Sequence, residues 1–204
     1  MSDVNPSDGH PADGDREGGE VPSNPAPFPR FEVESSERIY RSPWVGLRRD
    51  MLKLPEGGSQ EHHVIEISDA VCVLPITSEG RILMIGQHRY VHGKTHWEVP
   101  AGRLDPGEDP EAGARRELAE ETGYRAGNME RLPGFYPTNG ISAHWAHLFV
   151  ARDCELAGAQ TLDAAERILV ETFTWDEAEA LLRAGRIEDG FAALSLLYGL
   201  LMVR

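Results

Sequence analysis

The chain is most constrained by residues 102 to 124, GRLDPGEDPEAGARRELAEETGY, because a helix has clear boundaries there. Asp109 is a favourable N-cap, and Pro110 fits the first helical position, where its missing N–H costs nothing. Gly123 fits the residue after the last turn, where the backbone is often left-handed. The sequence therefore predicts a helix from about Pro110 to Thr122.

Three glutamates of this helix, Glu117, Glu120 and Glu121, project from one side, because residues three and four apart share a helix face. Converging carboxylates without a cation would raise one another's pKa and strain the helix. A divalent metal ion removes that penalty, and Mg²⁺ prefers oxygen ligands from carboxylates, waters and phosphates. The spacing alone leaves a second interpretation open, a solvated acidic stripe with ion-pair partners such as Arg116.

The residues around these glutamates fit a long pattern, G-x5-E-x7-R-E-U-x-E-E-x-G-U, in which U is a bulky apolar or aromatic residue. Every specified position is filled, the last one by Tyr124. By this motif the chain resembles the Nudix hydrolases, enzymes that cleave a nucleoside diphosphate linked to another group. The resemblance implies an α/β fold: a Nudix α/β/α sandwich with a mixed sheet, preceded by a small antiparallel amino-terminal β subdomain.

The resemblance also implies roles for residues of the motif. The three glutamates of the helix would bind Mg²⁺ or Mn²⁺, and Glu120 would also take part in catalysis. Arg116 would orient one glutamate through an ion pair, and Glu108 would brace the loop from behind the metal ligands. Gly102 would lie against the substrate.

Segments that flank the motif resemble the ADP-ribose pyrophosphatase subgroup. HWEVPAG implies that the backbone carbonyl of Ala101 binds a metal and that Glu98 lies on the strand leading to it. IGQHRY implies that Arg89 binds the substrate phosphates; the alternative is an ion pair with a surface carboxylate. ERIYRSPWVGLRRDML implies that Trp44, in an amino-terminal strand, stacks on adenine, and a place in the core is equally open. ERILV makes Glu166 a candidate catalytic base, in competition with the glutamates of the helix.

The loop YPTNGISAHWAHLF departs from the subgroup at Ala143 and His144, where an acid or amide often follows the serine. This departure bears on the choice of substrate more than on the chemistry. We expect His144 and His147 to be surface residues of a strand and not metal ligands, because a hard Mg²⁺ site prefers oxygen.

The resemblance favours ADP-ribose as the substrate, cleaved to AMP and ribose 5-phosphate. One alternative is a Nudix hydrolase of GDP-mannose, NADH or a dinucleoside polyphosphate. Another is a non-catalytic module that senses a nucleotide, although a sensor could lose glutamates of the motif and this chain keeps all of them. In each case the partner is a small nucleotide.

Composition sets the domain organisation. Residues 1–29 are mostly Pro, Gly, Asp and Ser and predict a disordered tail, because they have little to bury. Residues 30–66 contain short alternating segments and predict the amino-terminal β subdomain, which the resemblance makes a dimerisation unit. Residues 67–204 predict the Nudix domain, with core strands at 70–77 and 81–90, strand-like segments at 135–140, 147–152 and 168–173, and two closing helices that begin near residues 175 and 189.

Charge and hydropathy exclude other partners. The chain has 20 Lys and Arg against 34 Asp and Glu, a net charge of −14, which argues against a nucleic acid. No apolar run reaches the roughly 18 residues of a membrane span, and no signal peptide opens the chain. We therefore expect a cytoplasmic protein without a membrane partner, and the resemblance implies that it is a homodimer.

Overall fold

The computed structural model describes residues 23–26, 28 and 30–204. The predicted tail, residues 1–29, falls almost entirely outside the described residues. The chain divides into two units, Met1–Phe31 and Glu32–Arg204, and the second unit holds all the helices and strands of the described residues.

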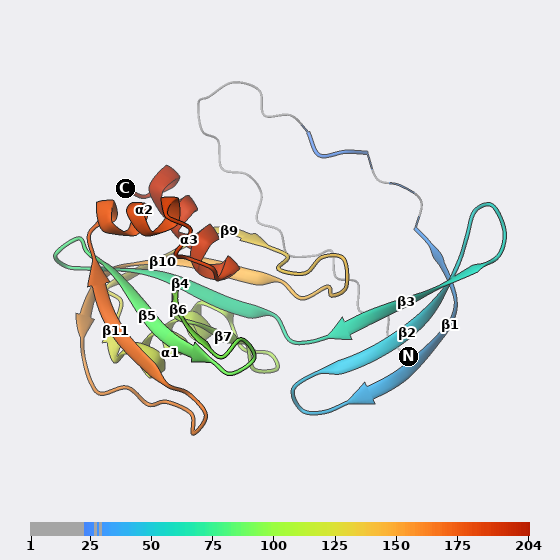
Figure 1. Ribbon diagram of the computed structural model, residues 1–204, viewed down its shortest axis with the longest axis horizontal. Coiled ribbons are helices and arrows are strands. Elements are labelled where there is room, and N and C mark those ends of the chain that lie inside the picture. Colours follow the sequence, from blue (N-terminus) through green and yellow to red (C-terminus); the bar gives the residue numbers. More distant parts are fainter. Residues whose placement is uncertain (1–22, 27, 29) are drawn as a thin grey trace. The chain divides into compact units, whose positions relative to one another are not determined.

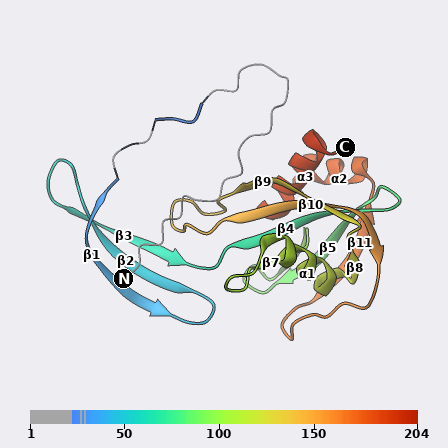
Figure 2. The ribbon, with the colours of Figure 1, turned by 180° about the vertical axis from the view of Figure 1, so that it is seen from behind.

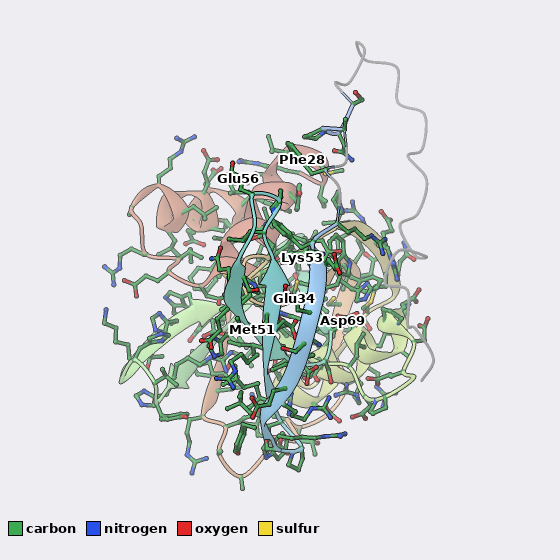
Figure 3. All side chains as sticks on the ribbon, turned by 90° about the vertical axis from the view of Figure 1, so that its right-hand side faces the viewer. Phe28, Glu34, Met51, Lys53, Glu56 and Asp69 are labelled. Carbon is green, nitrogen blue, oxygen red and sulfur yellow. The ribbon has the colours of Figure 1, made fainter. Side chains whose placement is uncertain are left out.

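The second unit begins with a three-stranded antiparallel sheet in the order β1-β2-β3 (Figure 1). Its strands are β1 (Glu32–Arg41), β2 (Gly46–Lys53) and β3 (Ser59–Glu66). β1 is exposed along its whole length. Polar contacts join β1 to both β3 and β2. Among them, Lys53 of β2, which is labelled in Figure 3, pairs with Glu32 of β1 at 2.9 Å. The predicted antiparallel amino-terminal sheet is confirmed.

A larger, eight-stranded sheet follows, in the order β11-β5-β4-β10-β8, with β6 on β5, β7 on β4 and β9 on β10. β10 runs parallel to β4 and the other pairs are antiparallel, so the sheet is mixed, as predicted. Its strands are β4 (Ala70–Thr77), β5 (Ile82–Arg89), β6 (Lys94–Glu98), β7 (Ala101–Arg103), β8 (Tyr124–Arg125), β9 (Asn128–Phe135), β10 (Ala146–Leu156) and β11 (Ile168–Phe173).

The three helices begin where the sequence predicts. In α1 (Pro110–Thr122) the Asp109 side chain accepts hydrogen bonds from two backbone N–H groups of the first turn, and Gly123 has a φ of 77°. α2 (Trp175–Arg183) opens with a complete capping box. Asp189 caps α3 (Gly190–Met202). No helix of the described residues is both long and apolar enough to cross a membrane.

The core lies on both faces of β4, because successive side chains of a strand point to opposite sides. Val71 and Val73 pack with Leu118 of α1, whereas Cys72 and Leu74 pack in the cluster that includes residues of α2 and α3. Figures 1 and 2 show α1 on one side of the sheet and the other two helices on the opposite side. This sandwich fixes α1, with its glutamates, beside β7.

Two predicted strands are wrong in part. The segment 135–140 is mostly a turn, since β9 ends at Phe135 and residues 137–141 form turns. Pro137 and the Asn139-Gly140 pair explain this, because these residue types favour turns. β9 itself was not predicted, because Pro133 and Gly134 interrupt its alternation.

Trp44 was expected in a strand and lies instead in the turn between β1 and β2. The Ser42 hydroxyl accepts hydrogen bonds from the backbone N–H groups of Trp44 and Val45, at 3.1 and 3.0 Å. Such a side-chain-to-backbone turn offers an alternative to strand pairing.

Candidate active site

A cavity of about 370 Å³ is lined by residues that are distant in the sequence. They come from the segment before β4, from β5, β6 and β7, and from the start of α3. Four of the predicted site residues line it: Arg89, Glu98, Ala101 and Gly102. The fold thus brings the HRY and EVPAG segments to one place.

The glutamates of α1 lie against β7. The backbone N–H of Ala101 donates a hydrogen bond to Oε2 of Glu121 at 3.0 Å, and Glu121 is only 3% exposed. A Cβ placed on Gly102 would be 2.0 Å from Oε1 of Glu117, so only a glycine leaves room for this carboxylate. Buried Glu121 and partly buried Glu117 therefore lie against the backbone that the resemblance assigns to metal and substrate.

Burial makes these carboxylates unfavourable as anions. Desolvation raises the pKa of Glu121 to about 8, and the neighbouring charges of Glu117 and Glu166 raise it further, against the hydrogen bond from Ala101. Desolvation also raises the pKa of Glu117. A solvated acidic stripe does not describe either side chain.

Arg116 organises the exposed side of the cluster. Its Nε and Nη2 donate to the two oxygens of Glu108, both at 2.9 Å, and its Nη1 donates to Glu117 at 2.7 Å and Glu120 at 3.1 Å. The hydrogen bonds from Arg116 lower the pKa of Glu108 to about 2. The bidentate pair with Glu108 fixes the guanidinium, and the guanidinium in turn holds two of the three glutamates.

The donor set fits a hard divalent cation. Among the described residues, no three His, Cys, Asp or Glu side chains already form a cluster suited to a metal ion, since Glu117 and Glu120 are held by Arg116. The available donors are carboxylate oxygens and the Ala101 carbonyl, which suit Mg²⁺ or Mn²⁺. A cation would also offset the desolvation that raises the pKa of Glu121.

Arg89 is paired with a buried carboxylate and not with a surface one. Its Nε and Nη2 donate to Glu98 at 2.9 and 2.6 Å, and Glu98 is 4% exposed. The Arg89 side chain is 43% exposed and lines the cavity. A guanidinium has five N–H donors, so the pair with Glu98 leaves donors for a phosphate.

Trp44 is 66% exposed, so the alternative of a core position is wrong. The Arg103 guanidinium carbon lies 4.7 Å from the centroid of the Trp44 ring, and Arg103 Nη1 donates to the Trp44 carbonyl at 3.0 Å. Arg103 also lines the cavity. The tryptophan is therefore joined to the rim of the cavity through Arg103.

Glu166 lies in the loop before β11, where its carboxylate accepts a hydrogen bond from the backbone N–H of Asp163 at 2.8 Å. Its charge contributes to the raised pKa of both Glu117 and Glu121. The loop thus brings a further carboxylate near the cluster.

Of the two histidines expected on a strand surface, His147 lies on β10 but is only 15% exposed, and His144 lies outside a strand. His144 precedes β10, is 8% exposed and lines the cavity, and burial lowers the pKa of both His144 and His147. The sequence reasoning also missed His96 and Glu188 as cavity residues. The sequence contained a signal for His96, because it stands two residues before Glu98 and therefore faces the same side of the strand.

Comparison with known proteins agrees with this geometry. Residues 67–193 match the NUDIX domain family. The chain belongs to this family. The predicted class, a Nudix hydrolase acting on diphosphate bonds, is confirmed at that level.

Two relatives match most of the chain. The ADP-ribose pyrophosphatase of Bacillus subtilis (strain 168) is 33% identical over 165 residues, 80% of this chain and 89% of the relative. The methanol dehydrogenase activator of Bacillus methanolicus is 35% identical over 164 residues, with the same two shares. A crystal structure of an ADP compounds hydrolase has a TM-score of 0.75 at 18% identity, covers 84% of this chain and 93% of its own, and supports the fold alone.

We expect Gly102→Ala to abolish most diphosphate hydrolysis while the chain stays folded. The added methyl group must displace the flexible Glu117 carboxylate, and a displacement of about 1 Å can cost roughly 100-fold in rate. Steady-state kinetics and thermal unfolding would measure the two effects. Gly140→Ala is the matched control, because a Cβ there meets nothing within 4 Å. Equal activity of the two variants would contradict the packing of Glu117 on Gly102.

Proposed function

We propose that the protein is a divalent-metal-dependent pyrophosphatase that hydrolyses ADP-ribose to AMP and ribose 5-phosphate. The observation that carries the proposal is a buried glutamate, Glu121, and a partly buried one, Glu117, packed on the backbone of β7 at the edge of a cavity that also holds Arg89. A guanidinium beside buried carboxylates suits a diphosphate that bridges cations.

In this proposal Glu117, Glu120, Glu121 and the Ala101 carbonyl hold Mg²⁺ or Mn²⁺. When bound, the cation neutralises charge on the phosphate oxygens and lowers the pKa of the attacking water. Arg116 positions Glu117 and Glu120 by its ion pairs.

The other side chains bind the substrate and move the proton. Arg89, fixed by Glu98, donates hydrogen bonds to the diphosphate through the N–H groups that Glu98 leaves available. Glu166 accepts the proton of the attacking water, with Glu120 as the second candidate for this task. Trp44, backed on one side by Arg103, offers a ring face to adenine, and stacking on a base contributes about 1–3 kcal/mol.

The name of the Bacillus subtilis relative supports ADP-ribose as the substrate, and the amino-terminal sheet that presents Trp44 supports an adenine subsite. GDP-mannose, NADH and dinucleoside polyphosphates remain the competing substrates. A nucleotide sensor without activity is the less favoured alternative, because the chain keeps all the glutamates of the motif.

ADP-ribose should be cleaved with a higher kcat/KM than GDP-mannose, NADH, a dinucleoside polyphosphate or any nucleoside triphosphate. Chromatographic separation of the nucleotide products measures this across the substrates with Mg²⁺. Trp44→Ala should mainly raise KM for ADP-ribose, because stacking acts alike in the ground state and transition state. Phe28→Ala, an exposed aromatic change in the other unit, is the control. A clearly better competing substrate would refute ADP-ribose and leave the hydrolase class intact.

Turnover should also require the metal and the buried carboxylates. Glu117→Gln and Glu121→Gln should each lower kcat by two or more orders of magnitude with the fold retained, and a chelator should stop hydrolysis reversibly. Glu108→Gln should do milder damage, since that residue contacts Arg116 and the backbone N–H of Asp105 and would act on the site through Arg116. Glu111→Gln, at an exposed pair with Arg115, should change little. Near-native activity of a folded Glu117→Gln/Glu121→Gln double variant would refute these roles.

We further propose a homodimer that forms through the amino-terminal sheet. β1 is an edge strand, and its exposed side chains include three large apolar residues, Val33, Ile39 and Tyr40, which a free surface would leave in water. Light scattering should give twice the chain mass, and Ile39→Glu should shift the equilibrium towards the monomer. Val91→Glu, at an exposed turn of the larger sheet, should not. A wild-type monomer at micromolar concentration would contradict the dimer.

A further inference from the structure

β6 carries a polar side chain, His96, for which the roles above have no use. Lys94, His96 and Glu98 alternate along the strand and point to one side. Two residues along a strand span roughly 7 Å. His96 therefore lies next to Glu98, the partner of Arg89. It is two residues farther from Ala101 along the chain than Glu98 is.

Glu188 fixes the orientation of the His96 ring. The Glu188 carboxylate lies 3.2 Å from Nδ1 of His96 and 3.9 Å from Nζ of Lys94. Glu188 directly precedes Asp189, the N-cap of α3, so its backbone is held at the start of a helix. Nδ1 therefore faces the carboxylate, and Nε2 is the ring atom left to bond another group.

Nε2 has no hydrogen-bond partner among the described residues. It is one of three buried side-chain atoms there without a partner, and another is Oε1 of Gln87, the residue opposite His96 on β5. An unsatisfied buried polar group costs about 1–3 kcal/mol, so the unpaired Nε2 indicates that a polar group of a bound molecule pairs with it. His96 lines the cavity, which is where such a molecule binds.

The charges around His96 favour a hydroxyl group over a second phosphate. Glu188 and Asp189 both line this part of the cavity, and their carboxylates disfavour an anion. Phe191 lines it too, and gives an apolar surface for the C–H face of a sugar. Arg103 of β7, whose guanidinium lies over the Trp44 ring, also lines the cavity. Glu98, the partner of Arg89, lies between β7 and His96 along the chain.

We propose that His96, oriented by Glu188, is a specificity-determining residue for the sugar of the substrate. Its Nε2 forms a hydrogen bond with a hydroxyl, which can donate or accept, of the sugar that is linked to the distal phosphate of a nucleoside diphosphate. This inference rests on the proposed pyrophosphatase function and adds how the group beyond the diphosphate is recognised.

The test compares two substrates that share the adenosine diphosphate: ADP-ribose, and ADP esterified with methanol on its terminal phosphate, which has no sugar hydroxyl there. His96→Leu should lower kcat/KM for ADP-ribose by about 3- to 10-fold, the effect of one hydrogen bond, mostly through KM. The methyl ester should change by less than 2-fold. Thermal unfolding checks that the variant is folded.

Variants of Glu188 separate positioning from simple support of the fold. Glu188→Gln keeps a polar group of the same size beside Nδ1 and should retain the preference for ADP-ribose. Glu188→Ala releases the ring and should lose the preference as His96→Leu does. Lys94→Met is the control, because Lys94 touches Glu188 without lining the cavity.

An equal loss on both substrates, or no loss on ADP-ribose, would overturn the role of His96. If another sugar nucleotide is cleaved better than ADP-ribose, the ADP-ribose proposal fails. The role of His96 is then decided by the effect of His96→Leu on kcat/KM for that compound, compared with its effect on the methyl ester of the same nucleoside diphosphate. A wild-type chain that cleaves none of these diphosphates would overturn both proposals.

Discussion

The contact between Glu121 and the backbone N–H of Ala101 is the interaction on which the site depends. It joins the fourth turn of α1 to the start of β7, and it is possible only because α1 packs its apolar face on β4 and β10. Burial holds the Glu121 side chain in place. It also disfavours the charged carboxylate, since it raises the pKa of Glu121 to about 8. The same packing that stabilises the sandwich therefore creates a carboxylate that gains from a cation.

Most of the fold could be predicted from local signals. Asp109, Gly123 and the capping box at Thr174 act through backbone hydrogen bonds within a few residues, so the three helices begin where the sequence places them. Apolar runs likewise identify β4 and β5. β9 was missed because Pro133 and Gly134 hide a strand that is formed by its long-range pairing with β10.

The site was predictable in its residue types and not in its contacts. The motif names the glutamates, but their spacing cannot distinguish Glu120, which is 43% exposed, from Glu121, which is buried. That difference comes from β7, which is brought to α1 by pairing with β4. The exposure of Trp44 and the burial of His144 depend in the same way on segments that are distant in the sequence.

β6 and β7 link these parts into one surface. Along a nearly continuous stretch, Glu98 fixes the arginine for the diphosphate, Ala101 and Gly102 meet the glutamates of α1, and Arg103 supports Trp44. Because a strand is stiff and its side chains repeat at a fixed spacing, each group stands at a set distance from the next. Under the proposed function, the groups on β6 and β7 would contact successive parts of the substrate, and His96, two residues before Glu98, would contact the part beyond the diphosphate. The proposed specificity thus depends on these two strands, whereas the proposed chemistry depends on the glutamates of the helix that packs beside them.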